Sequence, residues 1–261
     1  MYFVSELFIY PIKSLGGIAL NQSKIEARGL QYDRRWMLCN KQNEFITQRE
    51  NKNLALFKPQ ITKDGFALHY KNETNFEIPF SIIGHTETVK VWDDECEAIE
   101  YILGSAWFSK MLNFTCKLFY MPNQSERKVS EKYAQNKEIT SFSDGFPILI
   151  IGQESLNFLN TKLSKPIGMD RFRPNIVFTG GKPFDEDHFK DFSIGKNLLK
   201  GVKPCSRCVI TTIDQNTTKT SSEPLKTLAT FRNIDNNVLF GQNLITTKIE
   251  HEIKIGDEII L

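Results

Sequence analysis

The chain reads Arg171-Phe172-Arg173-Pro174-Asn175-Ile176-Val177 and, further on, Pro204-Cys205-Ser206-Arg207-Cys208-Val209-Ile210-Thr211-Thr212-Ile213-Asp214. The first segment carries two guanidinium groups and an amide beside a strand-like Asn-Ile-Val-Phe run. The second segment carries a Cys-x-x-Cys pair, and the β-branched run 209–213 follows its second thiol. Because β-branched residues favour extended backbone, this run is predicted to be a strand.

The pair formed by Cys205 and Cys208 has several possible roles. A redox pair of the thioredoxin type opens a helix, whose dipole lowers the thiol pKa, and a following strand removes that support. A structural zinc site needs two more ligands, but the other three cysteines are isolated and the four histidines are scattered. Two alternatives stay open: inert packed thiols, or a thiolate ligand for a soft metal centre. In the second case the anion-binding groups nearby would be Arg171, Arg173 and Arg207.

These segments resemble the MOSC domain, the module at the C-terminus of molybdenum cofactor sulfurases. The likeness rests on the patterns Arg-x-Arg-Pro-Asn-Ile-Val and Cys-Ser-Arg-Cys-x-x-Thr-Thr-x-Asp. It is closer to the subgroup that contains the mitochondrial amidoxime-reducing component and its bacterial relatives. Further matches follow in the family's order: Tyr10-Pro11-Ile12-Lys13-Ser14, Asp33-Arg34-Arg35-Trp36, Ser143-Asp144 ahead of Pro147, and Leu239-Phe240-Gly241-Gln242-Asn243.

The resemblance implies a site for the molybdenum cofactor, a pterin dithiolene that ends in a phosphate. In the family the second cysteine of the pair ligates molybdenum, which makes Cys208 the expected metal ligand and a catalytic residue. The family positions that hold the pterin and phosphate correspond to Lys13, Ser14, Arg34, Ser143, Arg173 and Asn175. Charge-assisted hydrogen bonds to a phosphate contribute roughly 1.5–3 kcal/mol each, so several together would hold the cofactor tightly.

Simpler interpretations of some of these residues remain. Lys13 and Arg34 could be solvated surface charges. The resemblance puts Asp144 near the metal as a second catalytic residue, where a carboxylate could handle protons or orient an N–OH group. A turn aspartate that caps a local backbone donor explains Asp144 equally well. Cys205 could lie close behind the metal or be merely packed.

Length and composition restrict the class of protein. A chain of 261 residues can bury a large core, and 25% charged residues are ordinary for a soluble globular protein. The formal net charge of +2, with Lys and Arg spread along the chain, argues against nucleic-acid binding. Five cysteines make no disulfide framework and suggest a reducing compartment. Since neither a targeting signal nor an apolar run of membrane-spanning length is evident, a cytoplasmic protein without membrane attachment is expected.

Short strands separated by turn residues are predicted at 3–10, 23–27, 36–39, 45–47, 54–57, 66–70 and 88–92. Apolar residues at helical spacing predict helices within 93–112 and 154–163. Strand patterns return at 116–121, 146–151, 175–178, 245–250 and 253–261, and the polar segment 122–138 is expected to cross between domains. The pattern predicts a mixed, mainly β fold. The resemblance implies a MOSC-type β-barrel with peripheral helices in 121–261 and an N-terminal MOSC-associated, barrel-like β domain in 1–120.

The N-terminal segments and the MOSC segments that resemble the family together suggest a molybdenum-cofactor-binding oxidoreductase that reduces small N-hydroxylated compounds. Some bacterial relatives end in a ferredoxin-type domain with a two-iron cluster, and the Cys-x4-Cys-x2-Cys spacing of such a cluster does not occur here. An upstream desulfurase domain is not expected either. Electrons are therefore expected from separate partner proteins of the ferredoxin or cytochrome/flavin reductase type. The alternative is a non-catalytic carrier of the cofactor or a sulfur-transfer module.

Overall fold

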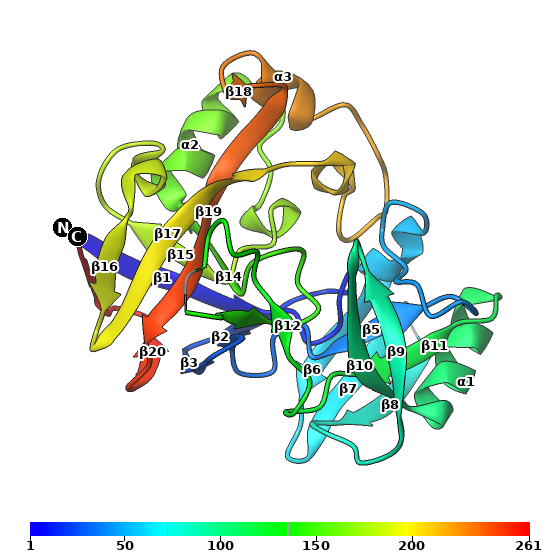
Figure 1. The fold of residues 1–261 in the computed structure, drawn as a ribbon. Helices are drawn as coiled ribbons and strands as arrows, with labels where there is room; N and C mark the ends of the chain where they lie inside the picture. The colour runs from blue at the N-terminus through cyan, green and yellow to red at the C-terminus, as the bar shows by residue number, and fades with distance from the viewer. Residues whose placement is uncertain (72, 135) are drawn as a thin grey trace.

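The computed structural model describes residues 1–71, 73–134 and 136–261. It is mainly β structure arranged as two lobes, a barrel and an N-terminal lobe, and both chain termini lie together at one edge of the barrel (Figure 1). The predicted mixed, mainly β fold is thereby confirmed. Within the described ranges, no helix combines the length and the apolar character that a membrane span requires.

Seven strands of the described chain close into the barrel, because β19 pairs back with β14. In order around the barrel they are β14 (Ile148–Gly152), β15 (Ile176–Thr179), β1 (Tyr2–Ile9), β21 (Glu258–Ile260), β16 (Asp191–Ile194), β17 (Asn197–Ser206) and β19 (Asn237–Lys248). The β14–β15 pair is parallel and the other six pairings are antiparallel. Short strands β2 (Ile18–Leu20) and β18 (Asn233–Ile234) extend the same sheet. Closure satisfies the backbone groups that an open sheet would leave at its edges.

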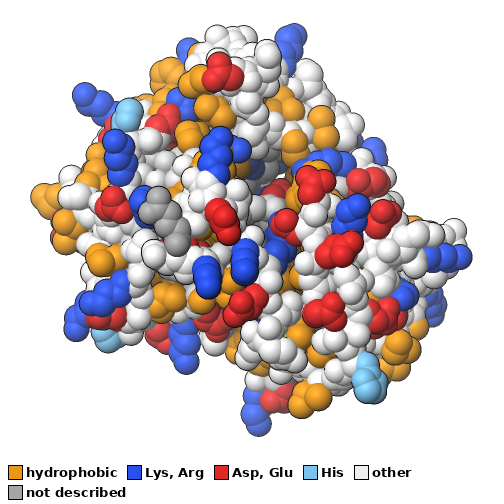
Figure 2. Space-filling model, viewed as in Figure 1, with side chains coloured by type: hydrophobic (Ala, Val, Ile, Leu, Met, Phe, Trp, Pro, Cys, Tyr) orange, Lys and Arg blue, Asp and Glu red, His pale blue; other side chains and the backbone are white. Residues whose placement is uncertain are grey.

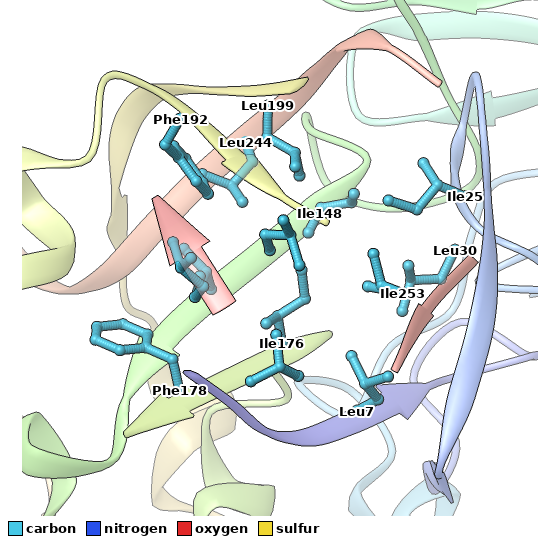
Figure 3. Packing of buried hydrophobic residues seen from close by; sticks show 14 of the residues in the cluster. Leu7, Ile25, Leu30, Ile148, Ile176, Phe178, Phe192, Leu199, Leu244 and Ile253 are labelled. Carbon is cyan, nitrogen blue, oxygen red and sulfur yellow. The ribbon is translucent and has the colours of Figure 1, made fainter. Parts of the chain in front are cut away.

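Apolar side chains fill the barrel, as Figure 3 shows. On β1, Leu7 and Ile9 are fully buried while Phe8 between them is only partly buried, the alternation of a strand with one face on the core. On β14, Ile150 and Ile151 are both buried, because helix α2 (Gln153–Lys162) covers the outer face of this strand. Helix α3 (Leu225–Ala229) packs in the same outer cluster.

The N-terminal lobe contains two further sheets and one helix. The first sheet has the order β5 (Trp36–Cys39), β11 (Lys117–Tyr120), β10 (Asp94–Glu100), β9 (Thr86–Val91). The second has the order β6 (Phe57–Ile61), β7 (Gly65–Tyr70), β8 (Glu73–Pro79). Helix α1 (Ile102–Leu112) buries Phe108 against Phe57 in an aromatic core. The smaller pairings are β20 (Glu252–Lys254) with β3 (Gln22–Glu26) and β4 (Gly29–Leu30), and β12 (Arg127–Lys128) with β13 (Ile139–Thr140).

The two lobes share parts of the chain. Strand β1 belongs to the barrel, where it pairs with β15 and β21, and β3 pairs with β20 near the C-terminus. The expected division at residues 120 and 121 therefore stays a prediction about sequence segments, since the first strand of segment 1–120 folds with segment 121–261.

Four local predictions are wrong. The strand expected at 45–47 is reduced to an isolated bridge between Phe45 and Cys39. The β-branched run 209–213 forms a 3-10 helix, η4 (Val209–Thr212), because the hydroxyls of Thr211 and Thr212 bond back to the carbonyls of Cys208 and Val209. The segment 93–101 forms a β-hairpin strand before α1, so Asp94 begins β10 and no helix. The segment 54–57 lies mostly in the 3-10 helix η1 (Lys52–Leu56). Two more 3-10 helices are η2 (Met169–Arg171) and η3 (Asp185–His188).

Candidate functional site

One cleft, lined by both lobes, brings the predicted site residues together. Its lining includes all of the candidates for metal and cofactor binding: Lys13, Ser14, Arg34, Ser143, Asp144, Arg173, Asn175 and Cys208. The barrel contributes the loops before β14 and β15 and the end of β17, and the N-terminal lobe contributes segment 47–49. The face drawn in Figure 2 is hollowed near its centre, where the lobes meet, and side chains of both charges surround the hollow.

Three of these residues hold a backbone conformation that residues with side chains rarely adopt. The angle φ is 69° at Ser14, 48° at Arg34 and 56° at Arg173. A left-handed residue of this kind costs roughly 1–2 kcal/mol, so its neighbours must hold it in position. At Arg34, the backbone N–H donates to Tyr10 O at 2.9 Å and the carbonyl accepts from Phe142 N at 3.0 Å. Such strain concentrates at ligand sites, and here it occurs at three candidates for cofactor binding.

Lys13 and Asp144 form an ion pair in the cleft. Lys13 Nζ lies 2.6 Å from Asp144 Oδ1 and also donates to Phe142 O at 2.8 Å. Burial lowers the pKa of Lys13 to about 8, although the carboxylate beside it acts in the opposite direction. The side chain of Asp144 is largely exposed, and the charge of Lys13 together with the indole N–H of Trp92 at 3.2 Å lowers its pKa. Asp144 is therefore an ionised carboxylate at neutral pH.

The lowered pKa of Lys13 predicts how anion binding depends on pH. Below pH about 8 the ammonium group adds a positive charge to the cleft, and above it this charge is lost while the guanidinium groups keep theirs. We expect the affinity of metal-free protein for inorganic sulfate, whose own charge is constant in this range, to fall as the pH rises through about 8. Titration calorimetry measures this change.

The matched variants are Lys13→Met and Lys13→Arg. Lys13→Met should bind sulfate weakly at every pH and should show no step near pH 8. Lys13→Arg should keep its affinity above that pH, because a guanidinium group stays protonated. An equally large step in Lys13→Met would assign the pH dependence to another group.

A second network connects Arg34 to the barrel. Arg34 Nη1 donates to Asp33 Oδ2 at 2.6 Å and to Asn175 Oδ1 at 3.1 Å. The amide of Asn175 also accepts from Leu149 N and donates to Phe8 O, both at 3.2 Å. Asn175 is thus an almost fully buried connection between strands, and its amide is largely satisfied by the protein itself.

Cys208 lies between β17 and η4, and its side chain is neither sealed in the core nor freely exposed. Arg49 Nη2 donates to Cys208 Sγ at 3.4 Å. Arg171, expected to bind an anion, instead lies outside the lining of the cleft and donates from Nε to Thr211 O at 2.8 Å. That expectation is wrong for Arg171, because its guanidinium group holds η4 in position behind Cys208.

Cys205 lines the same cleft and contacts Arg207. Arg207 Nη1 lies 3.0 Å from Cys205 Sγ, and Nη2 donates to Phe172 O at 2.6 Å. The Nε–H of Arg207 is buried and has no hydrogen-bond partner among the described residues. A buried guanidinium N–H without an acceptor is costly, which makes Arg207 a further candidate for binding an anion.

The other three cysteines, Cys39, Cys96 and Cys116, are buried in apolar clusters of the N-terminal lobe. Burial raises the pKa of Cys96 to about 11 and also raises the pKa of the other two thiols. These thiols stay protonated and act as packed apolar groups. Within the described ranges, no three His, Cys, Asp or Glu side chains gather in a way that could hold a metal ion, so the structure offers no support for a zinc site.

Several residues that line the cleft or contact its lining were missed by the sequence analysis. Arg49 follows the buried pair Thr47 and Gln48 in a segment that the pattern treats as the end of a strand. Trp92 stacks under the Arg49 guanidinium, with 4.7 Å between Cζ and the ring centroid. Arg127 lies in the polar segment 122–138 and has almost no exposed surface. For Arg49 the sequence offered one indication, the three polar residues Thr-Gln-Arg directly after two apolar residues. Nothing in the sequence indicated the roles of Trp92 or Arg127.

A partly exposed thiol lies beside guanidinium groups at the junction of a closed β-barrel and a second β lobe, and this combination could hold an anionic ligand and a soft metal. The comparisons with known proteins show the family of the chain. The model of the MOSC domain matches residues 137–260, and the model of the MOSC N-terminal beta barrel domain matches residues 1–115. The chain belongs to the MOSC-domain family.

Similar proteins cover nearly the whole chain. Mitochondrial amidoxime-reducing component 1 of Homo sapiens is 30% identical over 99% of this chain and 82% of its own length. The protein of the same name from Xenopus laevis is 28% identical over 92% of this chain and 76% of its own. Molybdenum cofactor sulfurase of Arabidopsis thaliana is 28% identical over 99% of this chain but only 35% of its own length. The chain is thus a MOSC protein related to molybdenum-cofactor proteins.

Proposed function

We propose that this protein binds the molybdenum cofactor through Cys208 and reduces small N-hydroxylated compounds with electrons from separate proteins of the ferredoxin or cytochrome/flavin reductase type. One observation carries the proposal: the partly exposed Cys208 thiol shares a cleft with Arg173, whose guanidinium group has no hydrogen-bond acceptor among the described residues. The similarity to amidoxime-reducing components over most of both chains supports the reaction class.

The residues present fit the cofactor. A thiolate is a suitable ligand for a soft metal centre. Arg173, Arg207 and Lys13 supply charged donors for a phosphate, and the buried Nε–H of Arg207 needs an acceptor that the described chain does not provide. When bound, the cofactor would supply the redox-active metal. Cys208 would hold it, and the basic groups would hold its terminal phosphate.

The chain's own residues can bind the substrate hydroxyl and supply a proton for the reaction. Reduction of an N–OH group consumes two electrons and two protons, breaks the N–O bond and releases water. Asp144 is ionised, so it can accept a hydrogen bond from the substrate hydroxyl but cannot donate a proton. Lys13, with a pKa of about 8, holds a proton 2.6 Å from that carboxylate and is suited to donate it near neutral pH.

A carrier or sulfur-transfer module is the second candidate, favoured by the similarity to the Arabidopsis sulfurase over 99% of this chain. Protein made in a host that synthesises the cofactor separates the two. We expect close to stoichiometric molybdenum by metal analysis, and turnover of an amidoxime with a reduced artificial dye as electron donor. Molybdenum without turnover would favour the cofactor carrier, and protein without molybdenum would exclude both the reductase and the cofactor carrier and leave the sulfur-transfer module.

A further inference from the structure

Two arginines of the cleft converge on one aromatic ring. The guanidinium carbon of Arg34 lies 4.5 Å from the ring centroid of Tyr10, and that of Arg173 lies 4.2 Å from it. Both distances are well inside the range over which a cation is attracted to an aromatic face. Arg34 and Arg173 lie 139 positions apart in the sequence, in the loops before β5 and β15. The ring of Tyr10, at the end of β1, is therefore where the two lobes bring their cations together.

We propose that Tyr10 is a positioning residue for the anion site, whose ring holds the guanidinium groups of Arg34 and Arg173 in the lining of one cleft, so that both can bind one phosphate-like anion. The inference rests on the proposed function only in its expectation that the cleft takes the phosphate of a cofactor. Tyr10 itself does not line the cleft, so it acts through the two arginines.

The two guanidinium groups need a support such as the Tyr10 ring, because two like charges that contact the same ring repel each other. Asp33 compensates the charge of Arg34, from which it accepts a hydrogen bond at 2.6 Å. Arg173 has no corresponding carboxylate bonded to it in the described chain, and the Tyr10 ring is its principal contact. The charge of Arg173 is thus held in position but left without a counter-ion, which is the state that an anion-binding group requires.

The ring itself is fixed from two sides. The backbone N–H of Tyr10 donates to Asp33 Oδ1 at 2.8 Å, so the carboxylate that pairs with Arg34 also holds the backbone of Tyr10. Gly17 packs against the ring, since a Cβ at this position would lie 2.5 Å from Tyr10 Cε1. Burial raises the pKa of Tyr10 to about 12, so the phenol is neutral and offers its ring face, not a negative oxygen.

Calorimetric titration of metal-free protein with inorganic phosphate tests the proposal. Tyr10→Leu should bind phosphate about tenfold more weakly, the scale of losing two desolvated cation–π contacts. Tyr10→Phe keeps the ring face and should bind within about twofold of the original protein. Replacing Tyr10 with pentafluorophenylalanine keeps the size of the ring but reverses the charge of its face, and it should weaken binding as Tyr10→Leu does. This variant keeps the test usable if Tyr10→Leu does not fold.

Two comparisons distinguish positioning from a structural role. In an Arg173→Met background, Tyr10→Leu should weaken phosphate binding less than it does in the original protein, because one of its two cation–π contacts is already gone. Phe184→Leu is the matched control, since Arg232 Cζ lies 4.4 Å from that ring outside the cleft, and phosphate affinity should not change. Unchanged affinity in the pentafluorophenylalanine protein, or an equal loss with and without Arg173, would overturn the proposal. Because no molybdenum is involved, failure of the proposed reductase function leaves this measurement intact.

Discussion

Protein with alanine in place of Cys208, made in a host that synthesises the cofactor, is expected to contain almost no molybdenum and to have no amidoxime reductase activity. The thiol of Cys208 is partly exposed and receives a hydrogen bond from Arg49. The thiols of the N-terminal lobe are buried and protonated. Removing Sγ takes away the proposed soft ligand, whereas the thiol of Cys205 in the same cleft contacts the Arg207 guanidinium group. Metal analysis and a dye-linked assay measure the two losses.

Controls separate loss of the ligand from loss of the fold. Cys208→Ala should keep its affinity for inorganic phosphate, because Lys13, Arg34 and Arg173 are untouched. Cys116→Ala removes a thiol of the N-terminal core, so it should lower stability while molybdenum content stays close to that of the original protein. Cys208→Ser tests the need for sulfur, since an oxygen of similar size is a poor ligand for a soft metal. A molybdenum content in Cys208→Ala equal to that of the original protein would contradict the assignment of Cys208 as the ligand.

The residues that line the cleft could be named from the sequence because the segments that carry them resemble the segments of the MOSC family. The structure brings all of these segments to one place, while their roles stay a prediction. Mainly β structure was equally predictable, since strands such as β5 and β7 carry clear patterns. The start of α1 was not predicted correctly, because the strand formed by residues 94–100 leads almost directly into the helix.

Other features depend on tertiary structure that local pattern does not contain. The run after Cys208 has strand propensity, but the threonine hydroxyls and the buried Arg171 guanidinium stabilise a 3-10 helix there. Likewise, β1 closes the barrel only through pairing with strands near the C-terminus. Trp92 acts through Asp144, fifty-two positions away, and Arg127 acts through Asp94, thirty-three positions away, and through carbonyls fourteen to seventeen positions away. Such partners can be found only from coordinates.

Arg127→Met is expected to have the second large effect, on stability and activity together. The guanidinium group is buried and donates to the carbonyl oxygens of Ser141 at 3.1 Å, Ser143 at 2.5 Å and Asp144 at 2.7 Å. Its Nε also donates to Asp94 Oδ2 at 2.8 Å. Methionine fills the space but supplies no donor, so the carbonyls lose their partners at a cost of roughly 3–5 kcal/mol. Urea unfolding measures this loss.

The effect on activity follows from the loop that Arg127 holds. Residues 141–144 carry Asp144 to within 2.6 Å of Lys13 and 3.2 Å of the Trp92 indole, and a loosened loop would separate these groups. The indole N–H resonance of Trp92 in a ¹⁵N NMR spectrum should therefore move in Arg127→Met and in Asp144→Asn. Lys128→Met, on the exposed next position of β12, is the matched control and should change neither stability nor this resonance. If Arg127→Met lowers activity while the resonance and the stability stay constant, Arg127 acts directly on the ligand and not through the loop.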